Sequence, residues 1–512
     1  MRHFCTYCVG STFALVLGSL YSALSVAATV PAAPSGTTTP VTAKPQGLPK
    51  PQTHAYTQKL SNADASSFTV NIGSIPVRGD NGNDIAHVFY MVYTLPGKNR
   101  PVTFALNGGP GASSVYLNMG AIGPVTVDFG NQKDSPSTDA KLHPNPATWL
   151  RTTDLVFIDP VGTGFSRPVK GLRAEEEKKS FYNATADVHY LSRVIYDWLV
   201  TNRRLQSPKF IVGESYGGYR APEIVYYMQT QMGVAFNGMI LMSPYFLGAL
   251  DVHKDVSPLY WIVNLPSIAA SQLERKGKLT ASAMQGVIDY ARGDYALALL
   301  KGNSDPQAEQ LMYQHVAALT GLSLQDVAYA HGRITPNLYI SEIDHDMGRL
   351  GSLYDPNVTA VNPSPADWPQ FANDPILQRM IAPTTTAMVD FVTKDLGFKS
   401  DSRYYALNYN VNSAWEWEDS AEGGAIGAFR SALANDPHLM ALIVHGWNDL
   451  ACPFMGSVLA IDQIPFLKHD NSQVEERNFP GGHMFYTRSD SREALYQTIR
   501  AFYQKDISAA AH

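Results

Sequence analysis

The chain has 512 residues, of which 45% are hydrophobic and 16% charged, so it is long enough to bury a sizeable core. Its formal net charge of −6 argues against binding to nucleic acid or to anionic membranes. After the N-terminus, no run of about 18 uninterrupted apolar residues predicts a membrane-spanning helix.

The N-terminus has the pattern of a secretory signal peptide; a buried first helix is the alternative. One arginine precedes an apolar stretch, and the small residues SVAA offer a cleavage site, so residues 1–28 are expected to be removed. Residues 29–53 are rich in Pro, Thr and Ala and predict a disordered leader. Cleavage removes Cys5 and Cys8, and Cys452 alone cannot form an internal disulfide. This favours a secreted or periplasmic bacterial protein.

The mature chain alternates between strand-like and helix-like segments. Two β-type runs around a turn predict a hairpin within 67–95. Strands are then expected within 101–114, 154–168, 208–218, 238–246 and 438–449, and helices within 184–200 and 219–232. This order predicts an α/β fold with a doubly wound, mostly parallel sheet, formed by residues 54–254 and 431–512. Between them, residues 255–430 lose the alternation and predict an inserted, largely helical cap.

A serine motif lies between an expected strand and an expected helix. Gly213-Glu214-Ser215-Tyr216-Gly217 matches G-x-S-x-G, in which glycines allow a tight turn that exposes the serine oxygen. The strand before and the helix after are the context that this motif requires, although an ordinary turn serine is the alternative. Ser215 is therefore a candidate nucleophile.

A serine hydroxyl needs a base to become a good nucleophile, and in this arrangement an acid and then a histidine follow the serine in the chain. Asp449 lies just beyond an expected strand, and His483 lies in a glycine-rich loop near the C-terminus. From the residues alone, His445 competes with His483, and Asp159 competes with Asp449 although it precedes the serine.

The chain resembles the serine carboxypeptidases, which are α/β-hydrolases that remove C-terminal residues, as a bacterial-type member without disulfides. The resemblance rests on NGGPGASS, IDPVGTGFS, GESYGGYRAPE, WND followed by Cys452, and GGHM, within about 85–250 and 438–486. It implies Ser215 as the nucleophile, His483 as general base and acid, and Asp449 as the group that orients His483. It also implies an oxyanion hole made by the backbone N–H groups of Gly109 and Tyr216.

The same resemblance gives a role to the glutamate before the serine. Glu214 and Asn107, helped by the backbone amide of Gly108, are expected to bind the free carboxylate of a peptide. Two carboxylates at hydrogen-bond distance cannot both stay ionised, so Glu214 has to be protonated, and activity is expected to favour mildly acidic pH. Ala121 stands where the family commonly has a second glutamate, so half of the usual carboxylate clamp is missing.

Other candidate groups receive plainer interpretations. The cluster Glu342, Asp344, His345 and Asp346 is interpreted as a solvated loop, so neither a metal nor a cofactor is expected. Cys452 is interpreted as an inert thiol. An apolar side-chain pocket is a candidate role for the aromatic residues Tyr116, Tyr245, Phe246, Trp415, Trp417 and Trp447, several of which are expected to be core.

The resulting hypothesis is a secreted or periplasmic serine carboxypeptidase that acts on the C-termini of peptides or proteins. An esterase or acyltransferase with the same triad is the first alternative, which Ala121 keeps open. A non-catalytic envelope protein that binds peptides is the second. The sequence assigns no oligomeric state and no side-chain preference.

Overall fold

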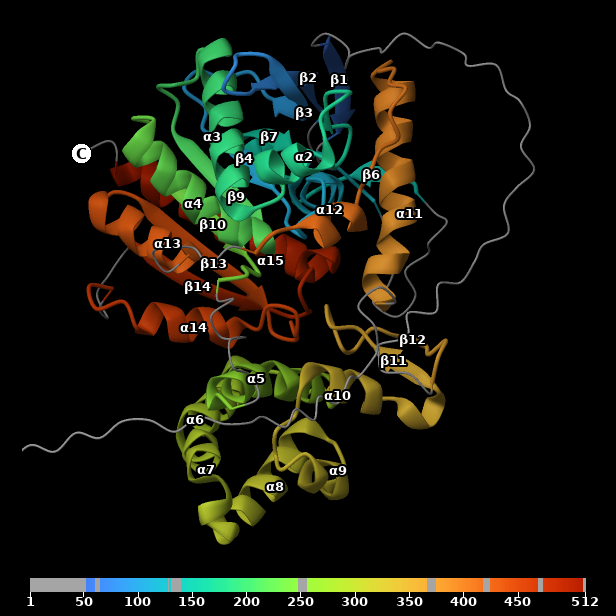
Figure 1. Ribbon diagram of the computed structural model, residues 1–512, viewed down its shortest axis with the longest axis vertical. Coiled ribbons are helices and arrows are strands. Elements are labelled where there is room, and N and C mark those ends of the chain that lie inside the picture. The colour runs from blue at the N-terminus through green and yellow to red at the C-terminus, as the bar shows by residue number, and fades with distance from the viewer. Residues whose placement is uncertain are drawn as a thin grey trace, which may run out of the picture. The chain divides into compact units, whose positions relative to one another are not determined.

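The computed structural model describes residues 52–59, 65–127, 129, 140–246, 256–365, 374–417, 424–467 and 473–509 (Figure 1). The expected signal peptide and nearly all of the expected leader lie outside these residues; Gln52 and Thr53 begin a strand. All described residues belong to one unit, 46–512. Within the described ranges, no helix combines the length and the apolar character needed to span a membrane.

The centre of the described chain is a mixed sheet in which β8 pairs with β3 and the other strands run β1-β2-β3-β7-β4-β9-β10-β13-β14. These strands are β1 (Gln52–Lys59), β2 (Ala65–Arg78), β3 (Asp84–Thr94), β4 (Val102–Leu106), β7 (Asp154–Ile158), β8 (Arg167–Pro168), β9 (Lys209–Glu214), β10 (Gly238–Met242), β13 (Met440–Gly446) and β14 (Val474–Phe479). Neighbouring strands from β7 to β14 are parallel, whereas β1, β2 and β3 pair antiparallel. The predicted mostly parallel sheet and the predicted hairpin are confirmed.

Helices cover both faces of this sheet, because strand side chains alternate between the two faces. Phe210 and Val212 of β9 pack into one hydrophobic cluster with α11 (Pro375–Asp390) and α15 (Ser489–Ala509). Ile211, between them, packs into the opposite cluster with α3 (Ala184–Thr201), α4 (Tyr216–Gln231) and α13 (Gly424–Asn435). Smaller elements are α1 (Val115–Leu117), α2 (Ala174–Phe181), β5 (Val125–Val127), β6 (Leu142–Pro144) and α14 (Phe454–Asp462).

Residues 256–365, here called the insert, form a mainly helical segment between β10 and α11. It holds α5 (Pro258–Arg275), α6 (Ala281–Tyr290), α7 (Ala296–Lys301), α8 (Pro306–Thr320), α9 (Leu324–Tyr329), α10 (Pro336–Glu342), β11 (Arg349–Gly351) and β12 (Thr359–Val361). Buried side chains such as Leu265, Tyr313 and Tyr339 give it a hydrophobic cluster of its own. By contrast, α11 packs on the sheet core, and α12 (Tyr409–Ala414) contributes Val411 to the opposite cluster. The stretch expected as one cap therefore has two differently packed parts.

The loops that follow the parallel strands carry the chemistry. β4 ends at Leu106, β9 at Glu214, β13 at Gly446 and β14 at Phe479. Because parallel strands end at the same edge of a sheet, the segments that follow them meet there. The sequence did not predict β14, whose residues VEERNF lack an apolar pattern because this strand lies at the sheet edge and is only half buried.

Candidate active site

Ser215 occupies a sharp turn between β9 and α4. Its φ of 60° lies in a region that residues with a side chain rarely adopt, which costs of order 1–3 kcal/mol. The surrounding chain holds this conformation: the Ser215 N–H donates to the Met242 carbonyl at 3.0 Å, and the Ser215 carbonyl accepts from the N–H groups of Gly218 and Tyr245. A Cβ on Gly213 would lie 1.9 Å from the Gly217 carbonyl oxygen, so the turn requires that glycine. This is the geometry expected of a nucleophile elbow.

Asp449 and His483 form a buried pair. Nδ1 of His483 lies 2.9 Å from Oδ2 of Asp449, and the other Asp449 oxygen accepts the N–H groups of Ala451 and Cys452. Burial alone lowers the pKa of His483, but the Asp449 carboxylate outweighs it, so the pKa of His483 is well above its ordinary value. Nε2 of His483 has no hydrogen-bond partner within the described residues. No described group therefore competes with a reacting hydroxyl for a hydrogen bond with Nε2 of His483.

Glu214 lies against the same histidine. Its Oε1 is 3.8 Å from Nε2 of His483 and accepts the Tyr486 hydroxyl at 3.2 Å, while its Oε2 accepts Nδ2 of Asn107 at 2.7 Å. Asn107 is itself fixed, because its Oδ1 accepts the Leu117 N–H. Burial raises the pKa of Glu214, although His483, Asn107 and Tyr486 oppose this shift. The environment therefore favours the protonated carboxyl more than water does.

The glycine-rich loop after β4 lies directly beside the elbow. A Cβ on Gly108 would lie 2.4 Å from the backbone nitrogen of Tyr216, so only glycine permits this approach. Tyr216 is the first residue of α4, and the N–H groups of the first helical turn have no acceptor within the helix. Gly109, Glu214, Ser215 and His483 line one common cavity. The two expected oxyanion donors therefore lie in the segments that meet at Ser215.

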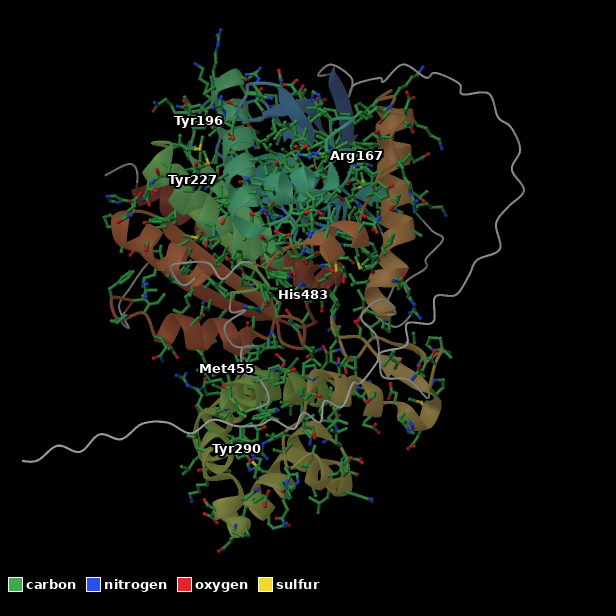
Figure 2. The ribbon with its side chains drawn as sticks, viewed as in Figure 1. Arg167, Tyr196, Tyr227, Tyr290, Met455 and His483 are labelled. Carbon is green, nitrogen blue, oxygen red and sulfur yellow. The ribbon has the colours of Figure 1, made fainter. Side chains whose placement is uncertain are left out.

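This cavity, of about 50 Å³, is also lined by Pro110, Ala112, Tyr116, Tyr354, Leu377, Leu407, Tyr409, Asn412 and Met484. The Tyr116 hydroxyl is buried and has no hydrogen-bond partner within the described residues. A second cavity of about 280 Å³ contains Tyr245, Phe246 and Cys452 in its wall, together with Tyr260 and Val263 of the insert. It adjoins the elbow, since the Tyr245 N–H donates to the Ser215 carbonyl. Figure 2 shows His483 at the border between the sheet core and the insert.

The two competing candidates for the base and the acid, His445 and Asp159, make contacts outside the Asp449–His483 pair. Nε2 of His445 pairs with the Ser457 hydroxyl at 2.8 Å, and burial lowers the pKa of His445 to about 4, so it is a neutral histidine. Oδ1 of Asp159 accepts the Ser114 N–H behind the glycine-rich loop. It is Asp449, and not Asp159, that contacts His483.

The remaining candidates are Cys452, the acidic cluster around Asp344 and three tryptophans. Burial raises the pKa of the Cys452 thiol, which disfavours its reactive thiolate. In the cluster of Glu342, Asp344, His345 and Asp346, which the sequence predicts to be a solvated loop, Asp344 accepts from Arg275 at 2.9 Å; the described residues contain no group of three possible metal ligands. Trp415 packs edge-on against Tyr216, and Trp447 packs against Phe454. Trp417 is 57% exposed.

Ala121 lies buried in the short helical segment Asn118–Ile122, and its carbonyl accepts Nδ2 of Asn145. Tyr486, which donates to Glu214, was missed in the sequence; its position shortly after His483 in the GGHMFY motif was the available signal. Tyr354 was also missed. Its ring meets that of His483 edge-on at 4.8 Å, and it comes from the insert, where no pattern marked it.

A family model for serine carboxypeptidases matches residues 63–512, which is most of the chain and includes every residue of this site. This chain belongs to the serine carboxypeptidase family. The resemblance inferred from the five motifs is thereby confirmed.

Individual relatives match shorter stretches of this family member. Serine carboxypeptidase-like 51 of Arabidopsis thaliana is 37% identical over 142 residues, covering 26% of this chain and 27% of that protein. The pheromone-processing carboxypeptidase KEX1 of Saccharomyces cerevisiae (strain JAY291) is 30% identical over 164 residues, covering 30% of this chain and 21% of that protein. The matched stretches thus span about a quarter of the length of these two relatives.

The fold comparison covers nearly the whole chain. The crystal structure of Kex1Δp, a prohormone-processing carboxypeptidase from Saccharomyces cerevisiae, matches with a TM-score of 0.52 at 17% identity, covering 86% of this chain and 91% of that one. At this identity the likeness concerns the fold, and the predicted α/β-hydrolase fold is confirmed.

Proposed function

We propose that this protein is a serine carboxypeptidase that releases C-terminal residues from peptides through an acyl-enzyme on Ser215. The observation that carries the proposal is the position of Glu214. It is a buried carboxyl group next to the nucleophile in sequence and 3.8 Å from the base, where it would hinder a general esterase by placing negative charge near the oxyanion. A glutamate at this position can assist catalysis only if its carboxyl group stays protonated and donates a hydrogen bond to the carboxylate of the substrate.

The reaction would follow the serine-hydrolase sequence. Nε2 of His483 takes the Ser215 proton as the oxygen attacks the last peptide carbonyl, and Asp449 stabilises the imidazolium. The backbone N–H groups of Gly109 and Tyr216 bind the oxyanion. His483 then gives the proton to the leaving amine, which departs as the released amino acid. Water, deprotonated by His483, cleaves the ester and restores Ser215.

Recognition of the chain end would come from Asn107, the Gly108 amide and Glu214. Protonated Glu214 donates a hydrogen bond to the substrate carboxylate, and such a charge-assisted bond is about twice as strong as a neutral one. Nδ2 of Asn107 donates to Oε2 of Glu214 at 2.7 Å, so Asn107 fixes the carboxyl group of Glu214 in the wall of the cavity. The cost of burying the substrate's charge is offset only if these donors are in place.

Tyr116 would supply a second hydrogen-bond donor to the substrate carboxylate, in place of the glutamate that is replaced by Ala121 in this chain. Tyr116 is 4% exposed and lines the cavity of Glu214 and Ser215, and its buried hydroxyl has no hydrogen-bond partner in the described part of the chain. An unsatisfied buried hydroxyl is costly unless a ligand completes it. A substrate carboxylate is the acceptor that this cavity is suited to receive.

The two cavities would divide the substrate between them. We assign the released residue to the cavity of Tyr116 and Leu377, and the preceding residue to the larger apolar cavity of Tyr245 and Phe246. The aromatic lining of the second cavity favours a large apolar side chain on the acyl side of the bond.

The cell compartment and the segments are also proposals. The expected signal peptide at 1–28 supports a secreted or periplasmic protein, and residues 29–53 would form a leader. Residues 54–254 and 431–512 would form the hydrolase core. Of the inserted stretch 255–430, the part at 256–365 would act as the cap, because α11 and α12 pack on the core. Peptides and proteins with accessible C-termini are the proposed substrates.

The test is a comparison of three blocked dipeptides that differ only in the C-terminal group: the free acid, the amide and the methyl ester. Cleavage of the peptide bond of the acid, with the amide at least about 100-fold slower, supports the proposal. Equal use of acid and amide, or hydrolysis of esters alone, supports the esterase or acyltransferase. A protein that a fluorophosphonate does not label at Ser215 supports the non-catalytic alternative.

A further inference from the structure

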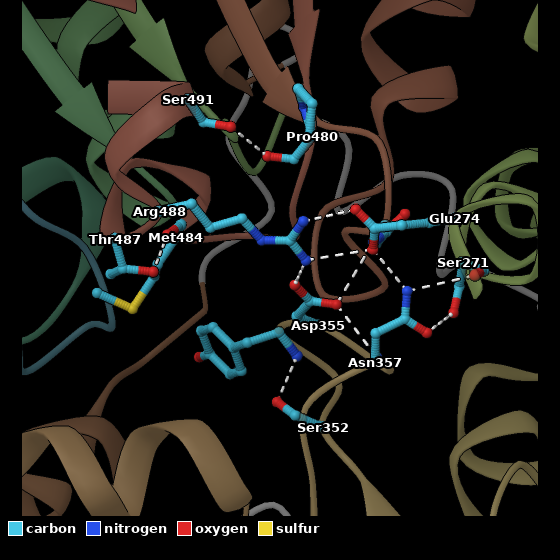
Figure 3. Close-up of polar contacts among 12 residues, drawn as sticks. Ser271, Glu274, Ser352, Asp355, Asn357, Pro480, Met484, Thr487, Arg488 and Ser491 are labelled. Atoms are coloured by element: carbon cyan, nitrogen blue, oxygen red, sulfur yellow. Dashed lines mark hydrogen bonds and ion pairs between the residues drawn. The ribbon is translucent and has the colours of Figure 1, made fainter. Parts of the chain in front are cut away.

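A buried ion cluster joins the insert to the loop that follows His483. Arg488 donates to Glu274 of α5 and to Asp355, which lies between β11 and β12, at 2.5 Å each (Figure 3). The side chains of Arg488 and Asp355 are 5% and 6% exposed, and that of Glu274 is 23% exposed. Because a guanidinium is a planar fork, it can bind both carboxylates in a fixed geometry.

The same cluster reaches the loop that carries Asp449. Asn448, the residue before Asp449, donates through Nδ2 to Oε2 of Glu274 at 2.6 Å. Its backbone N–H donates to the Gly481 carbonyl, which ties the Asp449 loop to the His483 loop. Glu274 therefore contacts both catalytic loops from a helix of the insert.

A third contact comes from Tyr354, the residue before Asp355. Its carbonyl accepts the backbone N–H of His483 at 2.5 Å, and its ring meets the imidazole edge-on. A Cβ on Gly482 would lie 1.8 Å from this carbonyl oxygen, so glycine is needed for the approach. One short segment of the insert thus contacts His483 directly and Arg488 through Asp355.

We propose that Glu274, Asp355 and Arg488 are positioning residues. Through their contacts with the insert they fix the loops of His483 and Asp449 in the positions that Ser215 requires. None of them lines the cavity of Ser215, so none is placed to touch the substrate there. The proposal rests on the proposed function, because it explains how the proposed catalytic residues His483 and Asp449 are held in place beside Ser215. Displacements near 1 Å in such a site reduce rates by up to about 100-fold.

The chain offers a matched control on the same helix. Arg275, next to Glu274, pairs with Asp344 of the insert at 2.9 Å and also donates to Asn357. Within the described residues, no direct hydrogen bond joins Arg275 to Arg488, Asn448 or Tyr354, although its partner Asn357 also donates to Oε2 of Glu274 at 2.6 Å. Arg275→Ala therefore removes an ion pair from α5 but leaves the link to the catalytic loops.

The experiment compares Glu274→Ala with Arg275→Ala in the full mature chain. For Glu274→Ala we expect kcat for a small ester to fall roughly 10- to 100-fold with KM within about twofold, and fluorophosphonate labelling to slow equally. Arg275→Ala should keep the wild-type kcat and labelling rate. The downfield proton resonance of the His483–Asp449 hydrogen bond should broaden in Glu274→Ala and persist in Arg275→Ala.

A folded Glu274→Ala protein with the wild-type kcat, labelling rate and proton resonance overturns the positioning role. If Glu274→Ala does not fold, Glu274→Gln replaces it, since the amide keeps the shape but lacks the negative charge that pairs with Arg488. Unchanged kcat and resonance in that variant then overturn the role. A wild-type protein that neither is labelled nor cleaves any substrate contradicts the proposed function, and the positioning role falls with it. An active wild type with an equally active Glu274→Ala contradicts the positioning role alone.

Discussion

Oε1 of Glu214 lies 3.8 Å from Nε2 of His483, so the carboxyl group proposed to bind the chain end directly neighbours the proposed base. The two groups have opposite needs. Glu214 works only while it keeps its proton, and His483 works as a base only after losing one. If both groups have the proposed roles, we expect catalysis to be confined to a pH range bounded by the ionisation of Glu214 and the protonation of His483.

Glu214→Gln tests the alkaline side of this range. Burial raises the pKa of Glu214, so the wild-type carboxyl is protonated below that raised pKa and ionises as the pH rises through it. In the wild type, kcat/KM for a free-acid peptide should fall over this step. Glutamine cannot ionise and still donates, so the variant should lose the alkaline decline, with a rate at acid pH reduced by about tenfold or less. The pH profile of kcat/KM checks this. An ester substrate is the control: the charge of ionised Glu214 near the oxyanion should slow it less than it slows the free-acid peptide, which also loses the bond to its carboxylate.

Asp449→Asn tests the acid side. The Asp449 carboxylate raises the pKa of His483 against the effect of burial, so its removal should lower that pKa. Because His483 must be neutral, the acid limb of kcat/KM should move to lower pH, while kcat falls by about 10⁴-fold. Stopped assays over a pH series on an activated ester measure both effects. A limb that stays in place would show that Asp449 does not set the protonation of His483.

Gly108→Ala separates oxyanion binding from chain-end recognition. The added Cβ would lie 2.4 Å from the Tyr216 nitrogen and 2.7 Å from the Glu214 carbonyl oxygen, so the loop must move away from the elbow. Loss of an oxyanion donor costs about 10²–10³ in kcat, so both esters and free-acid peptides should slow, and the peptides should slow further because the Gly108 amide that binds their carboxylate moves as well. Parallel kcat measurements on both substrates check this. A defect confined to free-acid peptides would assign Gly108 to carboxylate binding only.

Tyr116→Phe tests the proposed replacement for the missing glutamate. The hydroxyl has no partner in the described structure, so its removal should leave the melting temperature unchanged or slightly higher. We expect kcat/KM for free-acid peptides to fall about 10- to 100-fold, as for loss of a hydrogen bond to a charged group. Hydrolysis of the ester should stay near the wild-type rate. Equal losses on the ester and the acid would place Tyr116 outside carboxylate recognition.

Much of the core and of the candidate site was predictable from local patterns. Ser215, Glu214 and Asn107 directly follow or end buried strands, and short apolar runs before glycine-rich turns mark such positions well. Chain order after Ser215 favoured Asp449 over Asp159, and the family resemblance then implied His483 in place of His445. These signals work because the loops after parallel strands meet by topology, whatever the rest of the chain does.

The contacts that cross from the insert could not be predicted in the same way. Tyr354 and Glu274 reach the site from the insert. The helical pattern of the insert predicts which of its side chains pack together, but it does not predict which residues outside the insert they contact. The edge strand β14 was missed because its half-buried residues carry charges where a central strand carries apolar side chains. Long-range pairing between Arg488 and Glu274 leaves no periodic signal in either segment.

The central claim is that a neutral Glu214 recognises the carboxylate of a peptide chain end. The most direct measurement is the ratio of kcat/KM for a free-acid dipeptide to that for its amide, in the wild type and in Glu214→Ala. We predict a wild-type ratio of at least about 100 that falls to within about tenfold of unity in the variant. A ratio that Glu214→Ala leaves unchanged would contradict the claim.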